Sequence, residues 1–204
     1  MILQNLEGRR IILASKSPRR LELVRGLGLQ PEVVVRDVDE SWPAALAGPD
    51  VAAHVTRKKA EAFLPELGPE DVVITGDTVV LLPTETGYRV LEKPADRAHA
   101  IAMLLELQGR THVVASGVAV TTLRAGIALE VDTCEVTFSP FGEATAAHYV
   151  DTCAPFDKAG AYGVQDFMGL AHAVRLNGSF YTVMGLPTHV LYRLLAAVDA
   201  DLAR

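Results

Sequence analysis

The sequence predicts an α/β fold in which a mixed, twisted sheet has flanking helices and a central cleft. Short β-branched apolar runs alternate with segments of helical periodicity, and turn signals between the later runs predict antiparallel hairpins. Strand–helix units at the start of the chain favour parallel neighbours, so the sheet should be mixed. The chain has 204 residues, half of them hydrophobic, which is enough to bury a sizeable core. We expect a single domain over residues 1–204, with two lobes around the cleft.

Strands are expected where valine, isoleucine and threonine cluster between turn residues. The expected strands are 10–14, 32–35, 72–82, 88–91, 112–122, 127–138, 173–176 and 180–184. Hairpin turns are expected at 84–87, 124–126 and 177–178, and the last of these is an Asn-Gly pair, a strong hairpin signal.

Helices are expected where apolar residues recur at intervals of three and four. The expected helices are 18–26, 49–63, 94–107, 141–151 and 187–198. The segment 152–170 is rich in glycine and charge and predicts a long loop, which in a compact domain is usually functional or mobile.

The overall charge excludes two function classes. Nineteen basic residues face 25 acidic ones, a net charge of −6, whereas proteins that coat nucleic acid or membrane surfaces need excess positive charge. We therefore expect no nucleic-acid or membrane partner. Cys134 and Cys153 are too few for a disulfide framework, and residues 1–10 lack the pattern of a secretory signal, so a cytoplasmic location is expected.

Two arginines stand where the first helix should begin. Ser17 is a natural N-cap and Pro18 suits the first helical position, so Arg19 and Arg20 add positive charge to the positive end of the helix dipole. An anion bound there, such as a phosphate, would make this arrangement favourable. Two interpretations stay open from this stretch alone: a phosphate site, or two solvated surface arginines.

A carboxylate interrupts the most apolar strand of the chain. Asp77 lies in Gly76-Asp77-Thr78, between four apolar or β-branched residues on each side, where it loses hydration that a partner or a metal must replace. Gly76 allows a bulge or a close approach by another group. Asp77 is therefore a candidate metal ligand or general base; the alternative is a structural aspartate closing a bulge.

Further charged candidates flank these segments. Residues 37–40 supply three carboxylates in four positions, either as oxygen ligands for a cation such as Mg²⁺ or as an exposed acidic loop. Lys58, Lys59 and Lys93 are the matching cationic candidates, with a solvated helix face as the alternative for the first two. The six histidines never show metal-ligand spacing, and the chain has no dinucleotide-binding, P-loop or nucleophile-elbow motif.

Taken in order, these segments resemble the Maf-like nucleoside triphosphate pyrophosphatases over nearly the whole chain. The matching segments are 15–20, 76–80, 91–94, 109–112, 157–165 and 185–187. The resemblance implies a mixed α/β, cleft-bearing fold shared with inosine triphosphate pyrophosphatases, often dimeric, so a homodimer is expected. It also implies hydrolysis between the α and β phosphates, with a divalent metal cation, Mg²⁺ or Mn²⁺, as cofactor.

The resemblance also implies roles for individual residues. Asp77 corresponds to the catalytic proton acceptor and, with Glu40, to the metal ligands. The residues that correspond to the phosphate-binding set are Ser15, Ser17, Arg20, Lys59 and Lys93.

Base preference follows from three further positions. Arg19, Thr78 and Gln165 match the subgroup acting on dTTP and UTP, and a glutamine amide can donate to a pyrimidine carbonyl and accept from its N3–H. The chain departs from the family pattern at Lys16, Lys58 and Thr182. The alternatives are a 7-methyl-GTP-type or broader nucleotide pyrophosphatase, and a non-catalytic nucleotide-binding regulator of cell division.

A haloacid-dehalogenase-type phosphatase is a rival enzyme class, because an apolar strand precedes Asp37 and Asp39. Arg36 separates that strand from the first aspartate, and Gly76-Asp77 lacks a second acid four residues on. That class would release orthophosphate, whereas the resemblance predicts pyrophosphate.

Overall fold

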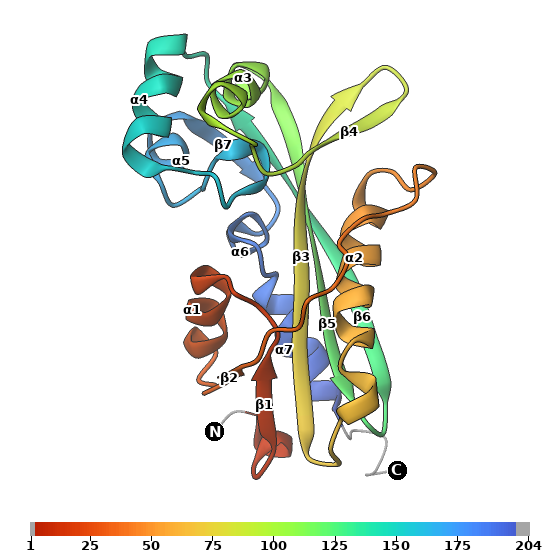
Figure 1. Cartoon of the computed structure of the whole chain (residues 1–204). Coiled ribbons are helices and arrows are strands. Elements are labelled where there is room, and N and C mark those ends of the chain that lie inside the picture. Colours follow the sequence, from red (N-terminus) through yellow and green to blue (C-terminus); the bar gives the residue numbers. More distant parts are fainter. Residues whose placement is uncertain (1–2, 199–204) are drawn as a thin grey trace.

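A computed structural model describes residues 3–198, and its backbone forms one seven-stranded sheet with helices packed against it (Figure 1). The strands are β1 (Arg10–Leu13), β2 (Glu32–Val33), β3 (Asp71–Thr84), β4 (Gly87–Leu91), β5 (Thr111–Thr122), β6 (Gly126–Phe138) and β7 (Ala173–Asn177). Their order is β2-β1-β3-β5-β6-β7, with β4 also paired to β3. β1 is parallel to β2 and β3, and the other pairs are antiparallel. The predicted mixed α/β sheet is confirmed.

The helices divide between the two faces of the sheet. They are α1 (Pro18–Gly26), α2 (Pro49–Glu61), α3 (Arg97–Leu107), α4 (Glu143–Cys153), α5 (Phe167–His172), α6 (Phe180–Met184) and α7 (Thr188–Ala197). Short 3₁₀ turns occupy Gln4–Leu6, Leu64–Glu66 and Ala159–Ala161. In Figure 1, α2 lies along the long strands β3, β5 and β6, whereas α3, α4 and α5 gather near one end of the sheet.

The long strand β3 carries two separate apolar clusters on one face. Val72 and Ile74 pack with α1 and α7, whereas Val80 and Leu82 pack with α3 and α4. Because side chains alternate between faces, the residues between these pairs on the same face are Gly76 and Thr78. The site described below lies where the two clusters separate.

The same stretch of β3 is also open along one edge. Pairing with β1 ends at Ile74, opposite Leu13, and pairing with β4 begins at Val80, opposite Leu91. Within residues 3–198, residues 75–79 therefore have a neighbouring strand only on the β5 side. Gly76 is required here because a Cβ would lie 2.8 Å from the Gly117 carbonyl oxygen on β5. Its role is close approach; the pairing with β5 continues through it without a bulge.

The expected strand at 180–184 is wrong, and with it the hairpin at 177–178. These residues form α6, which begins after Ser179 and buries Thr182 and Met184 while Tyr181 stays exposed. Gly178 has a φ of +138° and lies so close to β6 that a Cβ would be 2.8 Å from the Cys134 Cα. Gly178 thus allows the chain to pass close over β6, after which the chain turns back towards the pocket.

Two other boundaries differ from expectation. The segment 152–170 is only partly a loop, since α4 extends to Cys153 and α5 begins at Phe167. β2 is two residues long and stops at Val33. The remaining helices and strands begin or end within three residues of the expected positions, as is usual for element ends.

The expected single domain covers residues 1–204, of which residues 1–2 and 199–204 lie outside the described part, so this extent stays a prediction. Within residues 3–198, no helix has both the length and the apolar composition needed to cross a bilayer.

Candidate active site

The structure brings the predicted site residues together around the open edge of β3. Those lining one pocket are Ser17, Arg19, Arg20, Lys59, Asp77, Thr78, Lys93 and Gln165. The other two, Ser15 and Glu40, line an adjoining hollow that shares Ser17, Arg20, Lys59 and Lys93 with the pocket. They come from α1, α2, β3 and four loops, so only the tertiary fold assembles them.

Asp77 is held by a lysine from the neighbouring helix. Its side chain points to the α2 side of the sheet, where Lys59 Nζ lies 2.8 Å from Asp77 Oδ1 and 3.0 Å from Glu40 Oε1. Asp77 and Lys59 side chains are each 16% exposed. Asp77 Oδ2 accepts no hydrogen bond from any described residue and lines the pocket, so it is free to accept one from water or substrate.

Two carboxylates of the acidic segment 37–40 contact different lysines. Glu40 faces Lys59, as above. Asp39 instead accepts hydrogen bonds from Ser41 and from Lys58, 3.1 Å away, and these bonds lower the pKa of Asp39 to about 2. Lys58 therefore stabilises this loop, whereas Lys59, one residue later on the helix, faces the pocket.

The carboxylates of Asp77 and Glu40 fit a divalent cation only when substrate supplies further ligands. No group of three or more histidine, cysteine, aspartate or glutamate side chains converges within residues 3–198. Asp77 and Glu40 both contact the same cation, the Lys59 ammonium. Mg²⁺ commonly binds one or two carboxylates and takes its remaining ligands from phosphates and water, so these two oxygens suit it.

Arg20 is fixed by neutral acceptors. Its Nε donates to the Gly185 carbonyl (2.8 Å), one terminal nitrogen to Ser15 Oγ (3.3 Å) and the other to Thr78 Oγ1 (3.1 Å). A guanidinium has five N–H donors, so two remain for a ligand. Burial lowers the pKa of Arg20, the nearby Arg19 adds to this, and the carboxylate of Asp77 opposes it. An arginine desolvated without a directly bonded carboxylate is suited to bind an anion.

A chain of hydrogen bonds through Thr78 and Ser116 holds the Arg20 side chain in place. Ser116 donates to the Thr182 carbonyl (2.8 Å), so the Thr78 hydroxyl shares its proton between Ser116 Oγ (2.8 Å) and the Gly185 carbonyl (3.2 Å) and accepts from Arg20. The Thr182 hydroxyl in turn donates to Asp132. Thr78 is thus occupied in orienting Arg20.

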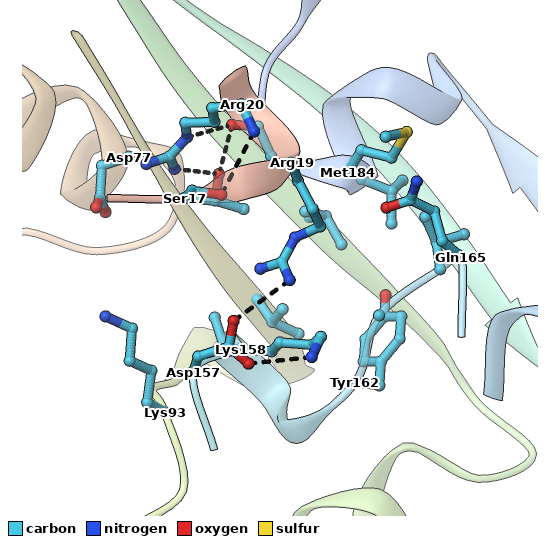
Figure 2. Close-up of a pocket in the computed structure, with 18 of the residues that line it drawn as sticks. Ser17, Arg19, Arg20, Asp77, Lys93, Asp157, Lys158, Tyr162, Gln165 and Met184 are labelled. Carbon is cyan, nitrogen blue, oxygen red and sulfur yellow. Dashed lines mark hydrogen bonds and ion pairs between the residues drawn. The ribbon is translucent and has the colours of Figure 1, made fainter. Parts of the chain in front are cut away.

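Arg19 points away from Arg20, towards the loop after α4. It lies 3.3 Å from Asp157, whose other oxygen is 3.0 Å from Lys158 Nζ (Figure 2). Lys158 also lies 3.5 Å from Asp166. The loop is seated on β3 by Gly160, at a φ of +67°, where a Cβ would lie 3.0 Å from Val80. This packing brings Asp157, Lys158, Tyr162 and Gln165 to the pocket wall.

The two ends of the pocket differ in chemistry (Figure 2). We call the side formed by Ser17, Arg20, Lys59, Asp77 and Lys93 the cationic end. Lys93 makes no ion pair with any described residue and its ammonium points to the space beside Asp77.

The opposite side is the apolar end, formed by Tyr162, Gln165 and Met184, and it offers one amide and one hydroxyl on an otherwise apolar wall. A pocket with cations at one end and tyrosine, glutamine and methionine side chains at the other suits a molecule with a polyanionic chain joined to a ring.

Sequence reasoning missed three residues of the pocket and one that supports it. Asp157, Lys158 and Tyr162 lie inside the segment 157–165 that carries the family resemblance, so the motif was a signal for their position without giving their role. Ser116 had no signal, because a serine within an apolar strand is identified only by its pairing opposite Thr78.

The comparisons with known proteins cover nearly the whole chain. The family model for Maf-like protein matches residues 10–198. A protein of Parabacteroides distasonis named dTTP/UTP pyrophosphatase is 40% identical over 195 residues, covering 95% of this chain and 98% of the relative. A protein of the same name from Bacteroides thetaiotaomicron is 43% identical over 194 residues, covering 94% and 97%.

Among solved structures, the chain is similar to the Ham1 protein of Staphylococcus aureus, with a TM-score of 0.46 and 15% identity over 64% of this chain and 72% of that one.

Proposed function

The chain belongs to the Maf-like protein family, and on this premise we propose that it is a nucleoside triphosphate pyrophosphatase that hydrolyses dTTP and UTP to the monophosphate and pyrophosphate. The observation that carries the proposal is the cationic end, where three basic side chains surround a carboxylate at the open edge of β3. In a chain of net charge −6, this local concentration of positive charge supports a polyanionic ligand.

Three groups bind the triphosphate in this proposal. Arg20 offers its two remaining N–H donors, Lys93 an ammonium without an ion pair among the described residues, and α1 the backbone N–H of Arg19, because Pro18 has no N–H and those of Arg20 and Leu21 bond to Ser17. Arg20 and the start of α1 are held in place before substrate arrives, so they stabilise charge that develops on the leaving pyrophosphate without reorganising. Ser15 contributes indirectly, because its hydroxyl holds Arg20.

Asp77 orients and deprotonates the attacking water. Lys59 fixes one carboxylate oxygen and leaves Oδ2 facing the pocket, which is the arrangement a general base requires. When bound by Asp77, Glu40 and phosphate oxygens, a divalent metal supplies Lewis-acid stabilisation of the phosphoryl charge. Lys59 contacts both carboxylates, so it also keeps them together in the absence of that cation.

Gln165 selects the base. Its amide lies at the apolar end, where it offers a donor and an acceptor to one carbonyl and the N3–H of uracil or thymine. Arg19 influences the same selection through its ion pair with Asp157, in the loop that carries Gln165, and the expected part of Thr78 in base preference stays a prediction.

The test is a panel of nucleoside triphosphates, including dTTP, UTP, CTP, GTP and 7-methyl-GTP, with Mg²⁺ or Mn²⁺ and with chelator. Monophosphate, pyrophosphate and orthophosphate are quantified separately. We expect pyrophosphate from dTTP and UTP, and loss of turnover with chelator. Orthophosphate as the primary product would contradict the proposal, and so would tight nucleotide binding with no product, which is the outcome for a non-catalytic regulator.

Other expectations stay predictions. They are a cytoplasmic location, a homodimer, the absence of a nucleic-acid partner, and the choice between ordinary and modified pyrimidine nucleotides as the physiological substrate.

A further inference from the structure

The hydroxyl of Tyr162 is a buried polar group on the pocket wall that the steps above do not use. Tyr162 is 5% exposed, and its ring packs edge-on against His112 and Phe138, with centroids 5.4 and 4.9 Å away. These contacts fix the ring. Its oxygen points into the pocket on the side where Gln165 lies (Figure 2).

The only hydrogen bond that Tyr162 makes with described residues joins its oxygen to His112 Nε2, 2.7 Å away. Either atom is able to donate, so the tautomer of His112 decides which does. His112 is fully buried, and its other ring nitrogen, Nδ1, has no hydrogen-bond partner in the described part of the chain. Burial lowers the pKa of His112 to about 3, so at neutral pH the ring carries one proton.

That proton belongs on Nε2. A buried N–H without an acceptor is rarer and more costly than a buried acceptor without a donor, so Nδ1 is the nitrogen left bare. His112 therefore donates to the Tyr162 oxygen, and the tyrosine's own proton is left without a protein acceptor. Burial also raises the pKa of Tyr162 above its ordinary value of 10, so the hydroxyl keeps this proton.

We infer that Tyr162 is a second base-binding residue, whose hydroxyl donates a hydrogen bond to the ring carbonyl that Gln165 leaves unpaired. Uracil and thymine present an acceptor, a donor and an acceptor along one edge: O2, N3–H and O4. Gln165 supplies a donor and an acceptor, and Tyr162 supplies the second donor, which completes the complementary pattern. His112 is the positioning residue that fixes the tyrosine as a donor. This inference rests on the proposed function.

The test combines a variant that keeps the ring with substrates that weaken one carbonyl at a time. We compare Tyr162→Phe with the unaltered protein on UTP, 2-thio-UTP and 4-thio-UTP, in which sulfur replaces one carbonyl oxygen and accepts hydrogen bonds poorly. For UTP we expect kcat/KM to fall about five- to tenfold through KM, the scale of one neutral hydrogen bond. The unaltered protein should discriminate against one thio analogue by a similar factor, and Tyr162→Phe should lose that discrimination.

Tyr149→Phe is the matched control. Tyr149 is buried beside the same loop, where its hydroxyl donates to Asp166 (2.9 Å) and accepts from the Gly163 N–H (3.1 Å), but it does not line the pocket. Its loss should lower the melting temperature and leave the ratio between UTP and the thio analogues unchanged.

A second pair of variants tests His112. His112→Gln retains an N–H for Tyr162 and should keep the discrimination, whereas His112→Leu should reduce it.

The outcomes separate this inference from its premise. If the unaltered protein releases no pyrophosphate from UTP, the proposed function fails. If it does release pyrophosphate but Tyr162→Phe keeps full discrimination against both analogues, or changes kcat/KM for UTP by less than twofold, the role of Tyr162 is overturned and the proposed function stands.

Discussion

The cationic end and the apolar end of the pocket are built by opposite means. At the cationic end, Lys59 and Arg20 are held by short contacts to oxygen atoms, and several donors remain free for a ligand. At the apolar end, Tyr162 is held by ring packing and by one neutral partner. In the proposed function, the first arrangement binds any triphosphate, whereas the second distinguishes bases by one or two hydrogen bonds. Variants at the cationic end should therefore lower activity on all nucleotides alike, and variants at the apolar end should change the ratios between them.

The largest effect is expected for Asp77→Asn. The amide cannot accept a proton from water, so kcat should fall by at least about 100-fold on every substrate, the usual scale for a general base. Product release and nucleotide binding are measured in parallel, since binding should persist. Asp151→Asn, at an exposed ion pair with Arg97, is the control and should turn over normally. Turnover by Asp77→Asn within tenfold of the unaltered protein would contradict the assignment.

Arg20→Lys tests the cationic end with the charge kept. Lysine cannot reproduce contacts to Ser15, Thr78 and Gly185 while presenting a fork to phosphate, so kcat/KM should fall roughly 30- to 100-fold. The fall should be equal for dTTP, UTP and slower substrates. Arg97→Lys, which removes an exposed bidentate pair with Asp151, is the matched control. A change in base preference in Arg20→Lys would show that the two ends are not independent.

Gln165→Leu should change the preference between bases and leave the hydrolysis step unaltered. Removing the amide leaves a carbonyl and an N3–H of the base unpaired, so kcat/KM for dTTP and UTP should fall about tenfold. Activity on nucleotides that do not use the amide should change less than twofold. Steady-state kinetics on the nucleotide panel measure this, and a uniform loss on all substrates would place Gln165 with the cationic end.

The last expected effect concerns stability at the apolar end and leaves activity unchanged. The pKa of His112 is about 3 in the folded chain and about 6.5 in the unfolded chain, so between these values the unfolded state binds one more proton. The free energy of unfolding therefore rises with pH across this window. On acidification from pH 7 to pH 5 it falls by roughly 2 kcal/mol. His112→Gln does not titrate, so its urea-unfolding free energy should fall by correspondingly less between the two pH values. Equal losses in both proteins would contradict a neutral, buried histidine.

The same contrast explains which parts were predictable. The cationic end consists of residues with strong local signals: a capping serine before two arginines, and an aspartate inside an apolar strand. The position of α1 follows from that signal, and the structure places Arg20 and Asp77 in one pocket. The helix at 180–184 could not be predicted, because β-branched and aromatic residues favour a strand and only the crossing of β6 at Gly178 decides otherwise.

The sequence by itself determined most of the element types, the mixed sheet and the charged residues, because each depends on the periodicity or chemistry of neighbouring residues. The tertiary structure decided which of those charges meet. It paired Lys59 with Glu40 and Lys58 with Asp39, since a helix or loop turns adjacent residues to different sides. It also brought Ser116 into contact with Thr78 and His112 into contact with Tyr162. These pairs are separated by 38 and 50 residues along the sequence. No local pattern encodes such pairs, because only strand register and packing bring them into contact.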